Sequence, residues 1–228
     1  MNWDDPMRLH SARELTDWVR EIGFLPLFRG EIPGFSAEEH TADGVWFTGD
    51  PEHDPWIWRE EIARAGEIAY GKFFGGRAGF VSPEWFPALA NYRRDGYDFD
   101  TLWEEGLARG RSKKLMDCLE LHGPMMSTDL KSAAGFGKGG EKNFSGIVTE
   151  LQMQTYLVVT DFRRKVSRAG AEYGMSISVL AAPETRWGYD AVTAAYAEEP
   201  AESLSRIREQ IRREFCWADV EALDRLLK

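Results

Sequence analysis

Residues 135–165 constrain the fold more than any other stretch, because three kinds of local signal follow one another there. The stretch opens with a glycine-rich loop at residues 135–140. An amphipathic helix is predicted next, since apolar residues recur at the three- and four-residue spacing that lines one helical face, namely Phe144, Ile147, Val148 and Leu151. β-branched and aromatic residues at 156–159 then predict a strand. A chain with this series is expected to combine helices and sheet.

The neighbouring segments predict an α+β fold with a winged-helix module in the C-terminal half. Helices are predicted at 112–121, 128–134 and 141–151, and strands at 154–162 and 175–181, joined by a turn at 168–174. Three helices followed by a hairpin form a winged helix, in which the third helix enters the major groove of DNA and the hairpin forms the wing. The same order also fits an ordinary α+β unit.

Composition suggests a division of the chain into three parts. Residues 1–108 form an aromatic-rich region, residues 109–182 the winged-helix module, and residues 183–228 a pair of helices expected to pack on that module. Within the first part, the pattern predicts a helix capped by Ser11, a long loop at 24–54, a helix at 56–65, a β-hairpin at 68–81 and a helix interrupted by Pro87.

The charge is unevenly distributed along the chain. Its net value is −10, yet residues 109–170 carry 11 Lys and Arg against 6 Asp and Glu, whereas residues 1–108 carry 10 against 21. A basic middle between acidic ends is typical either of a segment that faces a polyanion or of a solvated basic surface. The first alternative predicts duplex DNA as the partner, bound through cations of this region, which are Lys131, Lys138, Lys142, Arg163, Arg164 and Arg168.

Other classes of site find little support in the sequence. The glycine loop lacks the Gly-Lys-Ser/Thr ending of a Walker loop and follows no predicted strand, so Lys138 is expected to meet a DNA phosphate and not a nucleotide. No metal or cofactor is predicted, because the His and acidic residues of 40–54 lack fixed ligand spacing.

Cys118 and Cys216 are interpreted as core thiols. No segment is apolar enough for a membrane span, and a cytoplasmic location is expected.

Gln152-Met153-Gln154 stands at the predicted joint between helix and strand. If the backbone is extended there, residues two apart share a face, and both amides would point the same way with Met153 behind them. The surrounding TELQMQTYLVVTDF resembles the Gln-apolar-Gln/Asp signature of the AlkZ/YcaQ superfamily, which are winged-helix proteins that include DNA glycosylases for alkylated bases and crosslinks. The blocks DPWIWRE, YGKFFGGRAGFVS, NYRRDGYDFD and GFGKGGEKNF extend the resemblance to AlkZ-related bacterial proteins over nearly the full length.

The resemblance implies a DNA-binding protein with glycosylase-like activity. Gln152 and Gln154 would align the water that attacks an oxocarbenium-like sugar, with Glu150 or Asp161 as a nearby base. The hairpin at 68–81 would act as a wedge at the lesion through Phe73, Phe74 and Arg77. The alternatives are that both amides are buried and satisfy backbone groups, and that the protein is a non-catalytic DNA binder or a small-molecule sensor on the same scaffold.

Overall fold

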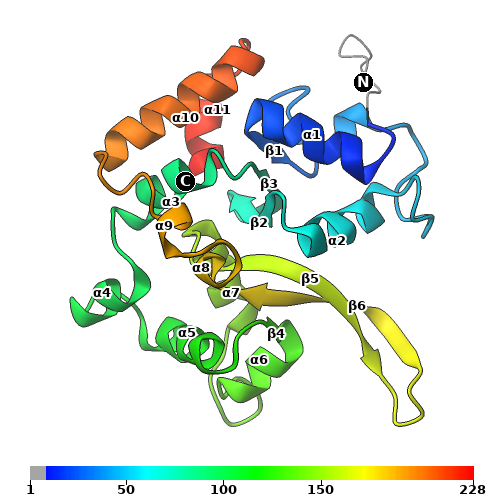
Figure 1. Ribbon diagram of the computed structural model, residues 1–228, viewed down its shortest axis with the longest axis vertical. Helices are drawn as coiled ribbons and strands as arrows, with labels where there is room; N and C mark the ends of the chain where they lie inside the picture. The colour runs from blue at the N-terminus through cyan, green and yellow to red at the C-terminus, as the bar shows by residue number, and fades with distance from the viewer. Residues whose placement is uncertain (1–8) are drawn as a thin grey trace.

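The computed structural model describes residues 9–228, which build one antiparallel sheet surrounded by helices (Figure 1). The strand order is β1-β3-β2-β5-β6-β4. The strands are β1 (Phe24–Pro26), β2 (Ala69–Phe74), β3 (Arg77–Val81), β4 (Met125–Met126), β5 (Val158–Val166) and β6 (Glu172–Ala181). This mixture of helix and antiparallel sheet confirms the α+β class.

The first part of the chain folds around β1, β2 and β3. Its helices are α1 (Ala12–Ile22), the 3₁₀ turn η1 (Glu38–His40), α2 (Pro55–Ala65) and α3 (Phe86–Arg94). Local capping explains where two of them begin: the Ser11 hydroxyl accepts a hydrogen bond from the backbone N–H of Glu14, and Asp54 caps α2 through the N–H of Trp56. The Asp54 carboxylate also accepts from the N–H groups of Phe47 and Gly49, so the helix cap fixes the preceding loop.

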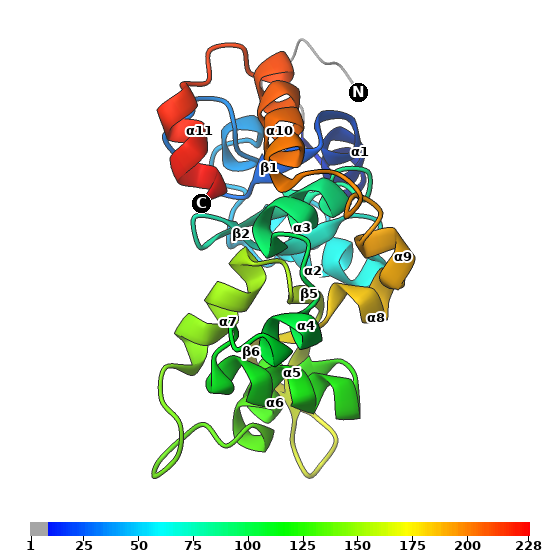
Figure 2. The same ribbon diagram turned by 90° about the vertical axis from the view of Figure 1, so that its left-hand side faces the viewer.

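The middle of the chain forms the end of the molecule that lies opposite α1 and β1, as Figure 2 shows. Its helices are α4 (Phe99–Glu104), α5 (Gly110–His122), α6 (Ser127–Ala133) and α7 (Phe144–Met153). The short strand β4, which the sequence did not predict, pairs with β6, and β6 pairs with β5 to form a long hairpin. This hairpin extends beyond the helices into solvent (Figure 1).

Helix α7 and its neighbours differ in their bounds from the predicted elements. The helix continues to Met153, and β5 begins only at Val158, because a tight turn at Gln154 and Thr155 separates them. Thr155 has φ of +63°, and the N–H groups of Tyr156 and Leu157 both point back to the carbonyl of Leu151. The prediction of a strand from residue 154 is therefore wrong. Pro87 lies in the first turn of α3, where no N–H is needed, and does not interrupt the helix.

The last helices pack on the first part of the chain and not on residues 109–182 as expected. They are α8 (Pro183–Trp187), α9 (Tyr189–Val192), α10 (Pro200–Glu214) and α11 (Val220–Leu227). Helix α10 lies along α3, where the Asn91 amide donates to Ser203 Oγ at 3.0 Å, and the Gln210 amide reaches the carbonyl of Ile22 at 3.0 Å. Both contacts give the buried amide N–H groups an acceptor and help to fix how α10 lies on the body, while Asn91 Oδ1 and Gln210 Oε1 have no partner within residues 9–228.

The sheet crosses the boundary predicted near residue 109. Tyr70 of β2 pairs with Val159 of β5, and the buried apolar residues form one continuous cluster from Leu9 to Leu227. The division into parts stays a prediction, while the backbone pairing joins the N-terminal hairpin to the β5–β6 hairpin. Within residues 9–228, no helix has the length and apolar character needed to cross a bilayer.

Strands β1, β2 and β3 lie close together at Gly79, so a side chain at this position is expected to destabilise the protein. A Cβ there would lie 2.4 Å from the Phe74 ring and 2.7 Å from the carbonyl oxygen of Leu25, so Gly79→Ala should cost about 2–3 kcal/mol of unfolding free energy. Gly110→Ala is the matched control, because a Cβ at Gly110 meets nothing within 4 Å and lies in the first turn of α5. Urea denaturation of both variants measures the difference, and equal stabilities would contradict the strand packing.

Candidate functional site

The two glutamines of the Gln-Met-Gln motif lie on different sides of α7. Residues two positions apart on a helix point in nearly opposite directions, so helical backbone through Met153 separates the two amides. The expectation that an extended backbone puts Gln152 and Gln154 on one face is therefore wrong, and the alignment of a water by both amides stays a prediction.

Gln152 is buried and hydrogen-bonded. Its side chain is 3% exposed, its Oε1 accepts from the backbone N–H of Lys72 at 3.0 Å, and its Nε2 donates to the carbonyl of Val148 at 3.4 Å. The pairing of β2 with β3 is irregular between Gly71 and Phe74, and the Lys72 N–H lies in this irregular stretch. Gln152 therefore replaces a missing strand contact and attaches β2 to α7.

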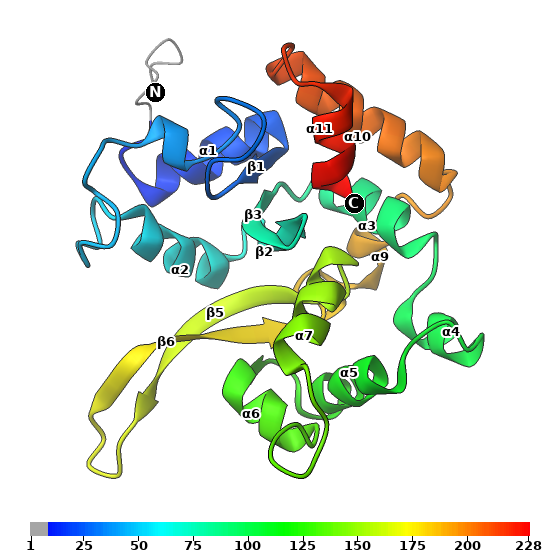
Figure 3. The same cartoon turned by 180° about the vertical axis from the view of Figure 1, so that it is seen from behind.

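Gln154 is partly exposed and lines an open groove of about 690 Å³. The groove is lined by residues of α7, α3 and the end of α11, and Ser145, Thr149 and Glu150 contribute its other polar groups. Figure 3 shows these three helices next to one another. The side-chain amide of Gln154 makes no hydrogen bond to any residue of the described chain 9–228. It is consequently free to bind a ligand.

Arg93 places a positive charge in the wall of this groove. Its guanidinium donates to three backbone carbonyls, those of Met153, Phe73 at 2.5 Å and Leu227 at 3.1 Å. No carboxylate of residues 9–228 forms an ion pair with it, and its buried Nε has no hydrogen-bond partner there. Burial lowers the pKa of Arg93 to about 10, so the group still carries its charge at neutral pH.

The adjacent Arg94 binds the turn that follows α7. Its guanidinium donates to the Thr155 carbonyl at 2.7 Å and to Thr155 Oγ1 at 3.1 Å, and it forms an ion pair with Glu184 at 2.5 Å. A β-branched residue rarely adopts positive φ, and Thr155 does so here while fully buried. Two consecutive arginines of α3 thus hold the turn in which the Gln-Met-Gln motif ends.

The six cations predicted to bind DNA are all exposed and lie on the middle part of the chain. Lys131 is on α6, Lys138 and Lys142 are in the loop before α7, and the three arginines are on the β5–β6 hairpin. Loop and hairpin turn lie at the end of the molecule opposite α1 and α10 (Figure 2). Arg163 is paired with Asp161 at 2.9 Å, whereas the other five form no ion pair within residues 9–228.

Phe73 and Phe74 cannot act as a wedge, because both rings are in the core. Their side chains are 0% and 1% exposed, and they pack against Phe86 and Phe35. Arg77 alone of the three predicted wedge residues is exposed.

The large apolar side chains exposed near the cations are instead on the β5–β6 hairpin. They are Val166, Tyr173 and Met175, the last of which is 88% exposed. None of the three is predicted from the sequence, although Val166 between Lys165 and Arg168 is a usable signal for an exposed apolar residue in a basic hairpin.

The two carboxylates considered as a base are both engaged. Glu150 pairs with Arg109 at 3.0 Å on the rim of the groove. Asp161 lines a separate polar pocket; burial raises its pKa, but hydrogen bonds from Arg163, the Phe162 N–H and Arg64 outweigh burial and lower the pKa overall. Only Glu150 shares a cavity with Gln154.

Residues 9–228 contain no group of three or more His, Cys, Asp and Glu side chains that could hold a metal ion. Cys118 is partly buried, and burial raises the pKa of its thiol, while Cys216 is exposed, so the interpretation of Cys216 as a core thiol is wrong.

Comparison with known proteins identifies a family. A family model described as "AlkZ related" matches residues 9–228. No curated protein and no solved structure gives a significant match.

The two glutamines should respond differently to a substitution of similar volume. Gln152→Met leaves the Lys72 N–H without an acceptor and should cost about 2 kcal/mol of unfolding free energy. Gln154→Met should change stability by less than about 0.5 kcal/mol, because its amide bonds no described residue. Thermal and urea unfolding of the pair provide the measurement, and a Gln154→Met variant as destabilised as Gln152→Met would contradict the assigned environments.

Proposed function

Because the chain belongs to the AlkZ-related family, we propose that it binds duplex DNA through a winged-helix module formed by residues 110–181. The succession α5, β4, α6, α7, β5 and β6 supports this proposal, since it gives three helices, a short strand between the first two and a terminal hairpin. In the proposed module the β5–β6 hairpin is the wing.

The observation that carries the proposal is the set of exposed cations without ion-pair partners at one end of an acidic protein. Lys131, Lys138, Lys142, Arg164 and Arg168 remain unpaired within the described chain, although the net charge is −10. Some nearby carboxylates are paired with other cations, as Glu141 is with Lys114 at 2.7 Å, whereas Asp129 and Glu172 form no ion pair within residues 9–228. Cations arranged in this way attract a polyanion and release its counterions on binding.

The accessible part of α7 suggests how a duplex would be approached. Of the ten helix residues only Ser145 is exposed. Gln152 accepts a hydrogen bond from the backbone of β2, and Thr149, at the edge of the groove, accepts one from the Lys72 side chain. The helix therefore offers its N-terminal end and the preceding loop, and not its whole length, to a groove of DNA. Backbone N–H groups at this end, with Lys138 and Lys142 beside them, would contact phosphates.

A glycosylase-like activity at the groove is the second candidate, and the free amide of Gln154 favours it. In this case Gln154 would position the attacking water, and Gln152 would act by holding α7 against β2. The charge of Arg93 argues in the opposite direction, since a cation without a counterion destabilises an oxocarbenium-like sugar nearby. The groove suits a phosphodiester better than this transition state, so we propose DNA binding without base release.

Salt titration tests the proposed DNA contact. Wild-type affinity for a duplex should fall with a log–log slope of about −4.5, if each of the unpaired cations contacts one phosphate and releases about 0.9 counterion. Arg168→Gln should reduce the magnitude of this slope by about 1. Arg212→Gln removes an exposed cation from α10 at the other end of the molecule and should leave the slope unchanged. Absence of binding at low salt, or equal effects of the two variants, would reject the proposed surface.

Base release separates the two candidates. Wild type and Gln154→Ala are incubated with DNA that carries N7- or N3-alkylated purines, and free base is measured. The DNA-binding proposal expects no release by either protein while the duplex is bound. Release by wild type that is lost in Gln154→Ala, with binding retained, would instead establish the glycosylase.

A further inference from the structure

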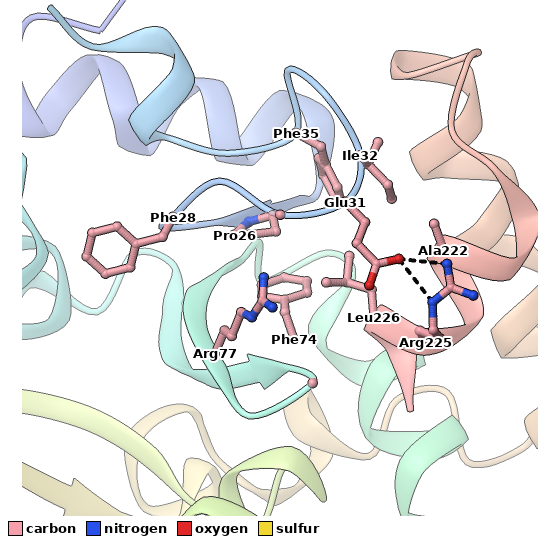
Figure 4. A pocket seen from close by; sticks show the side chains of 12 residues that line it. Pro26, Phe28, Glu31, Ile32, Phe35, Phe74, Arg77, Ala222, Arg225 and Leu226 are labelled. Atoms are coloured by element: carbon pink, nitrogen blue, oxygen red, sulfur yellow. Dashed lines mark hydrogen bonds and ion pairs between the residues drawn. The ribbon is translucent and has the colours of Figure 1, made fainter. Parts of the chain in front are cut away.

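The small cavity between α11, the β2–β3 turn and the loop after β1 is closed to ligands (Figure 4). Its volume is about 120 Å³, and the Phe35 and Phe74 side chains that line it are 2% and 1% exposed. Glu31 and Arg225, which also line it, already form an ion pair at 2.6 Å. This cavity therefore leaves no open surface for a ligand.

The polar pocket around Asp161 is larger and open. Its volume of about 320 Å³ is within the range of about 300–1,000 Å³ in which small-molecule sites fall. The Arg64 and Arg163 side chains in its wall are 61% and 60% exposed, so a ligand can reach them from solvent. The polar residues of this Asp161 pocket come from the end of α2, from β5 and from α8, and they are Arg64, Thr160, Asp161, Arg163, Thr185 and Arg186.

Three arginines and one carboxylate give the Asp161 pocket a charge of +3 and −1, which sums to +2. Asp161 Oδ1 lies 2.9 Å from Arg64 Nε, and Asp161 Oδ2 lies 2.9 Å from Arg163 Nε. One carboxylate thus orients two guanidinium groups and neutralises one of their charges. Arg186 forms no ion pair within residues 9–228, and Glu184, two positions before it, is paired with Arg94.

The Arg186 guanidinium is held against the end of α2. Its Nη2 donates to the carbonyl of Arg64 at 2.6 Å, and a Cβ on Gly66 would lie 2.1 Å from the same Nη2, so the glycine leaves room for this contact. The adjacent Trp187 donates to the carbonyl of Gly66 at 2.9 Å. The Nε and Nη1 of Arg186 bond no residue of the described chain 9–228 and remain available as donors. A group that is fixed before binding loses little conformational entropy when it contacts a ligand.

We propose that the Asp161 pocket binds a small phosphate monoester with a hydroxylated body, such as a sugar phosphate. A phosphate monoester carries a charge of about −2 at neutral pH, which matches the charge of the pocket, and guanidinium groups bind phosphate oxygens through parallel N–H bonds. The Thr160 and Thr185 hydroxyls are placed to bond hydroxyl groups of the body. None of the residues that line the pocket is aromatic, which disfavours a nucleobase.

Ribose 5-phosphate is the probe, and titration calorimetry without DNA measures its binding, so the result does not depend on the proposed function. Ribose keeps the hydroxyl groups without the charge, and inorganic phosphate keeps the charge without the body. Ribose 5-phosphate is expected to bind with a Kd of about a millimolar or lower. Ribose should bind at least about tenfold more weakly, and inorganic phosphate at least about threefold more weakly.

Two variants of the pocket and one control localise the binding. Arg186→Gln should weaken ribose 5-phosphate about tenfold or more. Arg163→Gln should do the same, and it decides the test if Arg186→Gln unfolds, because Arg163 is exposed and its only ion pair within residues 9–228 is with Asp161. Arg168→Gln removes an unpaired cation from the turn of the β5–β6 hairpin and should leave the Kd unchanged.

No heat from ribose 5-phosphate at about ten times the expected Kd would overturn the proposal. So would equal affinity for ribose or for inorganic phosphate, an unchanged Kd in a folded Arg186→Gln or in Arg163→Gln, or an equal loss in Arg168→Gln.

Discussion

Arg93 and Arg94 donate hydrogen bonds around the end of α7, and the arrangement of the other functional groups depends on these bonds. Arg93 joins three segments by donating to the carbonyls of Met153, Phe73 and Leu227. Arg94 holds Thr155 in a backbone conformation that this residue type avoids. Buried guanidinium groups are costly unless their donors are used. Arg94 uses its donors on Thr155, Glu184 and Tyr196, and Arg93 uses its Nη groups on backbone carbonyls, while the Arg93 Nε has no partner within residues 9–228. The turn in consequence ends α7 at Met153 and directs β5 into the sheet.

Because α7 ends at Met153, the two glutamines of the motif have different environments. Gln152 belongs to the joint between α7 and β2, where it supports the sheet that links the N-terminal hairpin to the β5–β6 hairpin. Gln154 remains available in a groove whose wall carries the Arg93 charge. The groove reaches Ser145 in the first turn of α7, three residues along the chain from Lys142. An anionic backbone that reached the loop before α7 would find the Arg93 charge of α3 beside the other end of α7.

Local signals in the sequence were sufficient to predict many of the helices and the N-terminal hairpin. Capping by Ser11 and Asp54, apolar spacing and the Gly75-Gly76 turn act within a few residues, and the helices and hairpin that they predict are present. The orientation of the glutamines was not accessible in this way, because the residue at which α7 ends is fixed by arginines about 60 positions away in the chain. Aromatic type alone likewise could not reveal that Phe73 and Phe74 are in the core, since burial depends on the helices that later cover the hairpin.

Hydrogen exchange of the backbone amides of Thr155 and Tyr156 tests the role of the arginine hydrogen bonds at this turn most directly. Both amides close the turn through bonds to Gln152 and Leu151. In Arg94→Met their exchange should accelerate at least about tenfold more than that of amides in β3, because the turn opens locally before the body unfolds. Arg109→Met, which removes an exposed pair with Glu150, should leave both rates unchanged. Exchange of the two amides that rises no more than that of β3 would contradict the account.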